Sequence, residues 1–273
     1  MQLDKIIIAL RQRNSWEAMD LGVQLMRGLW PVILFPWLIL ISGVLVFALF
    51  VQYLGYGILA LIFMWWIKPV YESMLLHILS RSVFGEYPST SDVLSFSAGW
   101  LKTGLFTSLF FWRFSPARSF NMSVHLLEGL KGNARRKRLL SLHRVAGLNS
   151  AAVTIIGVHF ETVLGITLYS VIFFIAPDIA ADYFSTDTEN SAVMQDGRES
   201  VQYVVGIIVY GVTLFIFEPF YVAAGFMLYL NRRTQLEGWD IEIDFKKLVQ
   251  RIGQQPGMHI VHSQSPLRSE NHV

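Results

Sequence analysis

The chain lacks cysteine and contains few charged residues. Its 273 residues include no cysteine, and Asp, Glu, Lys and Arg together make up 15%. The absence of cysteine excludes disulfides, thiolate metal sites and cysteine nucleophiles. A soluble domain would carry about 25% charged residues. Because hydrophobic residues reach 53% and gather in long runs, the chain is predicted to be an integral membrane protein.

Motifs of common enzymes are also missing. The sequence contains no phosphate-binding glycine loop, no GxSxG elbow and no HExxH motif. His259 and His262 are three residues apart in a polar tail and are expected to be solvated, while His125 and His143 have no carboxylate partner at a telling spacing. We therefore expect a non-enzymatic protein without a metal, a cofactor or a nucleic-acid partner.

Four apolar runs are long enough to cross a bilayer. They cover residues 30–54, 58–80, about 150–176 and 201–230, and the first two are separated by the turn residues Gly55-Tyr56-Gly57. The sequence therefore predicts an all-α helical bundle with four transmembrane helices. The first twenty residues do not resemble a secretory signal, because their apolar stretch is short and arginines follow at once.

Loop charges predict the orientation of these spans. Residues 81–149 carry ten Lys/Arg against three Asp/Glu, whereas residues 178–200 carry one Arg against six Asp/Glu. Because basic loops stay in the cytoplasm, both termini are predicted to be cytoplasmic and the 177–200 loop extracytoplasmic, in a bacterial inner membrane.

The segments outside the spans have distinct patterns. Residues 1–29 are predicted to form an amphipathic helix on the membrane surface, and 81–149 a basic cytoplasmic or interfacial helical segment. Within the latter, 103–112 are too short to cross and are expected to be interfacial or re-entrant. Residues 231–273 form a cytoplasmic tail that is predicted to be disordered after about residue 252.

A basic stretch in this region predicts lipid contacts. Its cations are candidates for binding anionic lipid headgroups, and they could equally serve only to enforce topology: Arg135, Arg136, Lys137 and Arg138.

The two halves of the chain share a pattern. Lys68-Pro69-Val70-Tyr71 and Glu218-Pro219-Phe220-Tyr221 fall at similar positions in the second and fourth apolar runs. We predict two parallel helix-hairpin repeats, 30–80 and 150–230, each with a proline kink whose freed carbonyl is satisfied by neighbouring polar groups.

Several titratable residues lie within the predicted spans. A lone carboxylate in the bilayer costs roughly 2.5 kcal/mol or more, so we expect Lys68 and Glu218 to form an ion pair across helices. Lys68 and Glu72 are four apart and could also pair, while Glu72 and His77 could reach the headgroups. Structural locking of the repeats and a functional role in binding protons, ions or a substrate are both open. The candidates are Lys68, Glu72, His159, Glu161 and Glu218.

Several segments resemble an uncharacterised family of bacterial inner-membrane proteins. They are SWEAMDLG (15–22), KPVYESMLLHILSRSVFGE (68–86), PARSF (116–120), LLEGL (126–130) and EPFYVAAGFMLYLNRRTQLEGWDIEIDF (218–245). Genes of that family often lie near those for MoxR-type AAA ATPases and transglutaminase-like membrane proteins, which implies an AAA ATPase as a partner. A more distant likeness is to the membrane domain of some glycerophosphodiester phosphodiesterases, without the catalytic barrel. The resemblance implies no catalytic residues.

Two functions follow as hypotheses. The first is a non-enzymatic scaffold or assembly subunit of a cell-envelope complex, which would contact partners or lipids through its basic face and the segment LEGWDIEIDFKKL (236–248), a short strand or an interfacial segment. The alternative is a transporter or channel component that uses the intramembrane charged residues.

Overall fold

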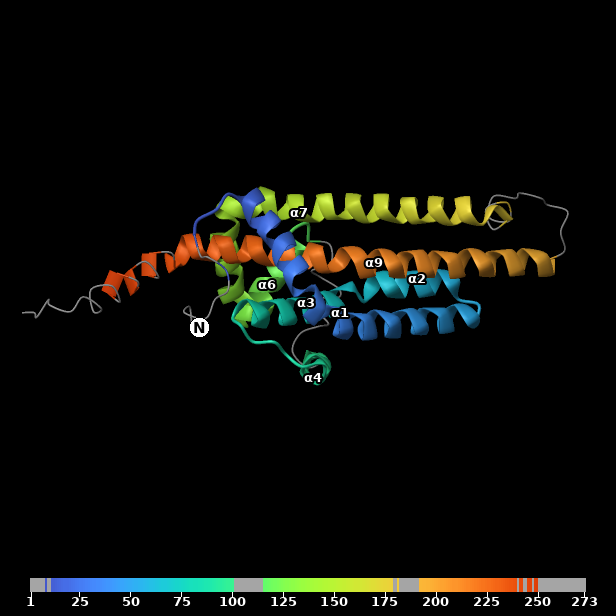
Figure 1. Ribbon diagram of the computed structural model, residues 1–273, viewed down its shortest axis with the longest axis horizontal. Helices are drawn as coiled ribbons and strands as arrows, with labels where there is room; N and C mark the ends of the chain where they lie inside the picture. The colour runs from blue at the N-terminus through green and yellow to red at the C-terminus, as the bar shows by residue number, and fades with distance from the viewer. Residues whose placement is uncertain are drawn as a thin grey trace, which may run out of the picture.

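The computed structural model describes residues 8, 11–100, 115–178, 181, 192–239, 241–242, 245–246 and 248–249. The helices in these ranges are α1 (Ser15–Tyr53), α2 (Gly57–Trp66), α3 (Lys68–Val83), α4 (Thr90–Trp100), α6 (Arg118–Glu128), α7 (Gly132–Ile175) and α9 (Ala192–Glu237). The long helices run side by side in an elongated bundle, and α4 lies apart from them, seen end-on (Figure 1). By length and composition, four helical stretches of the described chain could cross a membrane. The prediction of an all-α, multi-pass membrane protein is confirmed at this level.

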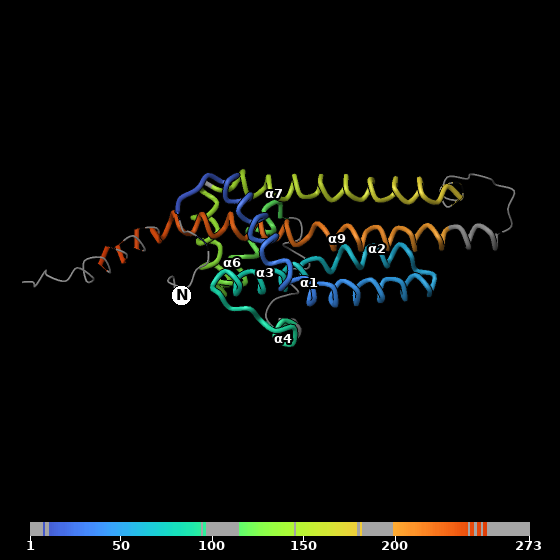
Figure 2. Tube along the Cα trace, viewed as in Figure 1, coloured from blue at the N-terminus to red at the C-terminus, as the bar shows by residue number. Residues whose placement is uncertain are grey.

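The first helix, α1, contains residues from two segments that the sequence predicts to be separate, the amphipathic segment and the first span. It begins after Asn14, whose side chain accepts a hydrogen bond from the backbone N–H of Glu17 at 2.7 Å. It then continues without a break to Tyr53, so the boundary predicted at residue 30 falls inside it. The helix contains Pro31 and Pro36, and Figure 2 shows that it changes direction along its length. Residues 15–29 of the predicted amphipathic segment are therefore an extension of the first span.

The second span is divided at its lysine. α1 ends in a turn in which Gly55 has a φ of 87°, and α2 begins at Gly57, as the sequence predicts. Ile67 interrupts the helix between α2 and α3, and Lys68 becomes the first residue of α3, followed by Pro69. Proline suits this position because its missing N–H has no helical partner there. The break thus places Lys68 at the N-terminus of a new helix.

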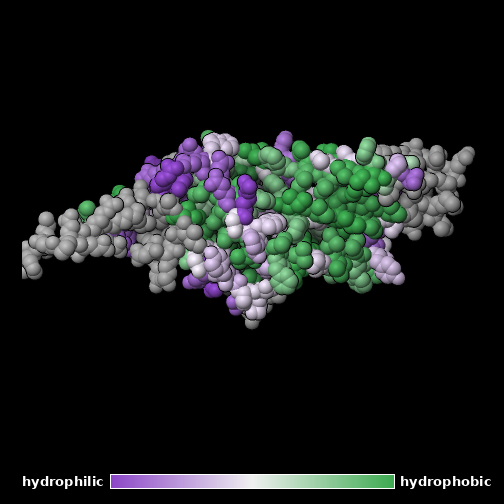
Figure 3. All heavy atoms as spheres, in the orientation of Figure 1, coloured by the Kyte–Doolittle hydropathy of each residue, from purple (hydrophilic) through white to green (hydrophobic). Residues whose placement is uncertain are grey.

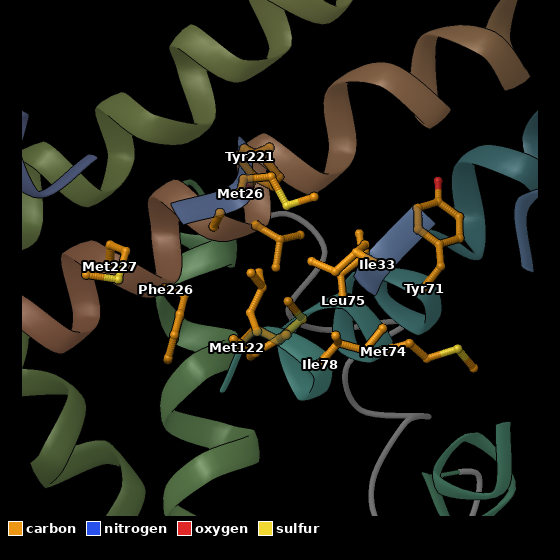
Figure 4. Packing of buried hydrophobic residues seen from close by; sticks show 14 of the residues in the cluster. Met26, Ile33, Tyr71, Met74, Leu75, Ile78, Met122, Tyr221, Phe226 and Met227 are labelled. Carbon is orange, nitrogen blue, oxygen red and sulfur yellow. The ribbon is translucent and has the colours of Figure 1, made fainter. Parts of the chain in front are cut away.

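The core surrounds α3. Buried residues of α1, α3, α6 and α9 pack against one another there, and Figure 4 shows Met26, Leu75, Met122 and Phe226 from these four helices. Of the 16 residues of α3, 13 are buried, including serines and charged residues. A helix this polar is costly to expose to lipid tails, so the other helices shield it.

The fourth span, α9, lies at the centre and contacts α1, α2, α3, α6 and α7. Unlike the second span, it runs without a break through Glu218 and Pro219. Pro219 removes the hydrogen-bond donor for the carbonyl of Phe215, and the indole N–H of Trp37 donates to that carbonyl at 3.0 Å. A neighbouring polar group thus satisfies the freed carbonyl, as predicted. The backbone differs between the two sites, because the helix is interrupted before Lys68-Pro69 and continuous through Glu218-Pro219. The parallel-repeat arrangement stays a prediction.

The third span continues from the basic stretch. α7 runs from Gly132 to Ile175, so the boundary predicted at 149/150 lies inside one helix, since no proline interrupts it. Arg138 of α7 bonds Glu237 of α9, and Arg13 bonds Asn231, which brings the basic segments to one end of the bundle. Figure 3 shows hydrophilic residues at that end and a hydrophobic surface over α1, α2 and α9. Which side of the membrane this end faces stays a prediction.

Some sequence predictions fall on residues that the structure does not describe. These are the 103–112 segment, the tail after residue 252 and most of the acidic 177–200 loop. The segment around Trp239 is described in part, and its residues 239, 241–242, 245–246 and 248–249 are helical. Of the two alternatives for this segment, the short strand is therefore wrong. Gly238, which has a φ of 63°, separates these helical residues from α9.

The closest approach of α1 and α9 yields a stability prediction. A Cβ atom on Gly22 would lie 2.6 Å from the carbonyl oxygen of Ala223, whereas a Cβ on Gly28 of the same helix meets nothing within 4 Å. We expect Gly22→Ala to lower the free energy of unfolding by about 1–3 kcal/mol through overpacking. Gly28→Ala should be neutral or stabilising. Thermal unfolding in detergent measures both, and equal melting temperatures of the two variants would contradict this packing.

Candidate functional site

The side chain of Lys68 lies between two carboxylates from different helices. Its Nζ donates to both carboxylate oxygens of Glu161 on α7 at 2.7 Å and lies 3.3 Å from Oε2 of Glu218 on α9. Lys68 is 4% exposed and Glu218 is fully buried. The predicted ion pair between Lys68 and Glu218 is confirmed, and Glu161 is the closer partner. One ammonium group thus connects α3, α7 and α9.

A second buried ion pair lies next to the first. Glu72, one turn after Lys68 on α3, pairs with Nη2 of Arg118 at the start of α6. From the sequence, Glu72 could pair with Lys68 or reach the headgroups. Instead Glu72 is fully buried and pairs with Arg118, while Lys68 pairs with Glu161 and Glu218. Burial lowers the pKa of Arg118, but the acidic groups around it, with Glu72 foremost, together outweigh burial, so the net pKa is raised and the guanidinium stays charged.

Sequence reasoning missed Arg118, and a signal for it existed. The predicted spans contain the carboxylates of Glu72, Glu161 and Glu218 but only one lysine. Three buried carboxylates with one cation require further cations or protons, because each unpaired charge is costly in a low-dielectric environment. The arginines of the 81–149 segment, which include Arg118 in PARSF, were therefore candidates.

The cluster still has one carboxylate more than it has cations. We define it by five side chains: Lys68, Glu72, Arg118, Glu161 and Glu218. Within the described chain, neither side-chain oxygen of Glu218 accepts a hydrogen bond. Its polar neighbours include the Lys68 ammonium and the carboxyl group of Glu72. A bound proton would neutralise the carboxylate that exceeds the two cations. The arrangement can therefore hold a proton.

The cluster borders a cavity of about 750 Å³ between α2, α7 and α9. Along α7 the lining runs from Thr154 to Tyr169, about 22 Å at the rise of an α-helix. Lys68, Arg118, Glu161 and Glu218 all line its half nearer α6. The other half is mainly apolar and is lined by residues that include Leu61, Gly165, Ile166, Gly206 and Val209.

The cavity is open on one side. Several of its apolar lining residues are exposed: Ile62 at 46% and Trp65 at 42% on α2, and Val158 at 55% and Ile166 at 61% on α7. Within the membrane, exposed apolar residues of this kind contact lipid tails. A molecule dissolved in the bilayer could therefore enter between α2 and α7.

His159 is not part of the cluster. It is two residues before Glu161 on α7, and its side chain is exposed and does not line the cavity. In a helix, residues two apart point in different directions, which explains why only one of them faces α3. His159 is therefore a suitable control position for variants of Glu161 and Glu218.

The four predicted headgroup cations differ in exposure and in their partners. Arg135 is buried, and burial lowers its pKa. Arg138 bonds Glu128 at 2.8 Å and also pairs with Glu237, and these hydrogen bonds, with the Glu128 bond foremost, raise its pKa. Arg136 and Lys137 are exposed. Of the four candidates, these two are placed to meet a lipid headgroup.

Metal ligation finds no support in the described part of the chain, where no group of three or more His, Asp or Glu side chains could hold an ion. His259 and His262 lie outside the described residues. Comparisons of the chain with protein-family models, with curated proteins and with solved structures find no match. The family resemblance stays a prediction, and function has to be argued from the cluster and its cavity.

The ion pairs predict a specific pattern of stability. We expect Lys68→Met to lower the free energy of unfolding by about 3–5 kcal/mol, because it leaves Glu161 and Glu218 without their common cation. The double variant Lys68→Met/Glu161→Gln should recover part of that loss. Unfolding in detergent measures both, with His159→Gln as a control that should behave like the wild type. A double variant less stable than Lys68→Met would contradict the pairing.

Proposed function

We propose that the protein is a component of a membrane transporter or channel, and that its cluster carries protons or other ions. The observation that supports this proposal most strongly is the placement of the cluster on the wall of the cavity. A cluster that served only to hold helices together would need neither the cavity nor the additional carboxylate. Here Lys68, Glu161 and Glu218 all belong to the lining of the cavity, although the carboxylate oxygens of Glu218 are buried.

Depth in the membrane also supports transport. Glu161 is about 21 Å from the end of α7 at Ile175, and a hydrocarbon core is about 30 Å thick. The cluster would therefore lie within the core, nearer the end of the bundle that carries the basic segments. Intramembrane ionisable residues commonly mark ion pathways and proton relays. With the orientation proposed from the loop charges, this end faces the cytoplasm of a bacterial inner membrane.

Reconstitution into lipid vesicles tests the proposal. Vesicles that contain the protein and a pH-sensitive dye should equilibrate an imposed pH gradient faster than protein-free vesicles. Glu218→Gln should reduce the rate to that of protein-free vesicles, because it removes the carboxyl group that lies at the centre of the cluster. Glu86→Gln changes an exposed acid outside the cluster and should leave the rate unchanged. Equal rates for wild-type and protein-free vesicles would exclude proton transport.

A second candidate function is docking of a protein partner, as expected for a scaffold. After α9, the exposed side chains of Ile241, Phe245, Leu248 and Val249 recur at helical spacing and form one apolar face. The segment is held to the bundle at Trp239, whose ring lies 4.7 Å from the guanidinium carbon of Arg233. An exposed apolar face on a charged helix suits a helix-in-groove contact. The resemblance to the bacterial family points to a MoxR-type AAA ATPase as the partner.

Co-purification with a MoxR-type ATPase tests this docking. We expect Ile241→Ser/Phe245→Ser to reduce the recovered ATPase severalfold, because the double change interrupts the apolar face. Lys246→Gln alters the polar face, where the lysine pairs with Glu242 at 3.2 Å, and should retain the partner. The same recovery with both variants would show that the segment is not the docking site, whatever the outcome of the vesicle experiment.

A further inference from the structure

We infer that the cavity binds a hydrophobic organic cation, and that this cation exchanges with a proton held by the cluster at Glu218. The inference deepens the proposed transport function and rests on it. It assigns a ligand class from three features: the charge balance of the cluster, the aromatic and apolar lining of the cavity, and the position of its mouth.

Charge balance favours a cation. The titratable groups around Glu218 come from each side: Lys68, Tyr71 and Glu72 on α3, Arg118 on α6, Glu161 on α7, and Tyr210 and Tyr221 on α9 itself. With all acids ionised and the tyrosines neutral, three carboxylates face two cations, which leaves one negative charge. Within the membrane this charge is costly unless a proton or a second positive group neutralises it. An anion would double the imbalance.

Aromatic rings in the lining already contact cations. The Nζ of Lys68 lies 5.9 Å from the centroid of the Tyr210 ring, and the guanidinium carbon of Arg118 lies 5.7 Å from that of Tyr221. Trp65, Phe217 and other aromatic side chains contribute further faces to the cavity. Aromatic faces attract positive charge, most strongly where water is excluded. The lining therefore suits an ammonium or phosphonium centre.

The size and the mouth of the cavity exclude a small inorganic ion as the preferred ligand. A volume of about 750 Å³ matches pockets for small organic molecules, which occupy about 300–1,000 Å³. A hard metal cation requires several oxygen ligands in place of its water shell. The entrance instead presents Ile62, Trp65, Val158 and Ile166, which favour a ligand that partitions into lipid tails.

The exchange is balanced in charge. Before binding, the cluster holds one proton at Glu218 and is neutral. When the organic cation enters the cavity, the proton leaves to water and the freed carboxylate balances the charge of the cation, so the cluster and its ligand are again neutral. One proton is released for each cation bound, no covalent bond other than the O–H bond breaks, and no other reactant is needed.

Binding of tetraphenylphosphonium to the purified full chain tests the inference. In weakly buffered detergent solution, a pH indicator should report about one proton released per cation bound. Because the cation competes with one proton, its affinity should increase by about tenfold for each unit by which the pH is raised, as long as the cluster is protonated. Tetraphenylborate has the same shape and the opposite charge, and should not bind. Binding of both ions, or binding without proton release, would overturn the inference.

Variants identify the groups that take part. We expect Glu218→Gln to weaken tetraphenylphosphonium binding by about tenfold or more and to remove the proton release. Gly165→Leu places a side chain in the apolar half, where an added Cβ meets only Oγ1 of Thr213 at 3.8 Å, and should weaken binding without changing the charges. His159→Gln should bind like the wild type. Melting curves exclude unfolded variants, and wild-type binding by folded Glu218→Gln would overturn the inference.

The outcomes separate this inference from the proposed function. Proton flux in vesicles together with no binding of tetraphenylphosphonium would leave the transport proposal intact and show that the ligand class is wrong. Cation binding with proton release, but no flux, would support the ligand class and show that the protein binds the cation without transporting it.

Discussion

The ammonium group of Lys68, held between Glu161 and Glu218, is the interaction on which the rest of this structure depends. α3, α7 and α9 each contribute one of these three side chains, so the contact fixes the depth of each helix relative to the others. It also leaves a charge to be explained, because Arg118 pairs with Glu72 and the cluster retains a carboxylate beyond its two cations. Burial of this cluster in a membrane is costly unless a proton or a positive ligand balances the remaining charge. The cavity beside it provides space for such a ligand.

The backbone around the cluster follows from the same constraint. A break at Ile67 places Lys68 at the entrance of α3, and the other helices enclose α3 because it carries serines, an acid and a lysine. In α9 the helix instead continues through Pro219, and the indole of Trp37 satisfies the carbonyl that proline leaves free. Polar groups that lipid could not satisfy are thus satisfied within the protein. The packing also requires a close contact of α1 with α9 at Gly22, where there is no space for a side chain.

Much of this architecture could be predicted from the sequence, and the exceptions have physical causes. Apolar runs and loop charges predict four spans and one basic end, and the cost of isolated charges in lipid predicts the pairing of Lys68 with Glu218. Helix boundaries were less predictable, because α1 and α7 continue past the point where their composition changes. The partner of Glu72 was missed because Arg118 is distant in sequence and lies outside any apolar run. The cavity depends on how far α7 stands from α2, which only the assembled fold determines.

Infrared spectroscopy of the purified protein tests the central claim most directly, because a protonated carboxyl group has a C=O stretch separate from that of a carboxylate. At neutral pH we expect the wild type to show the band of one protonated, buried carboxyl group, and the band should be absent from Glu218→Gln and should disappear when tetraphenylphosphonium binds. A wild-type spectrum with every carboxyl group ionised at neutral pH would contradict the claim that this cluster holds a proton.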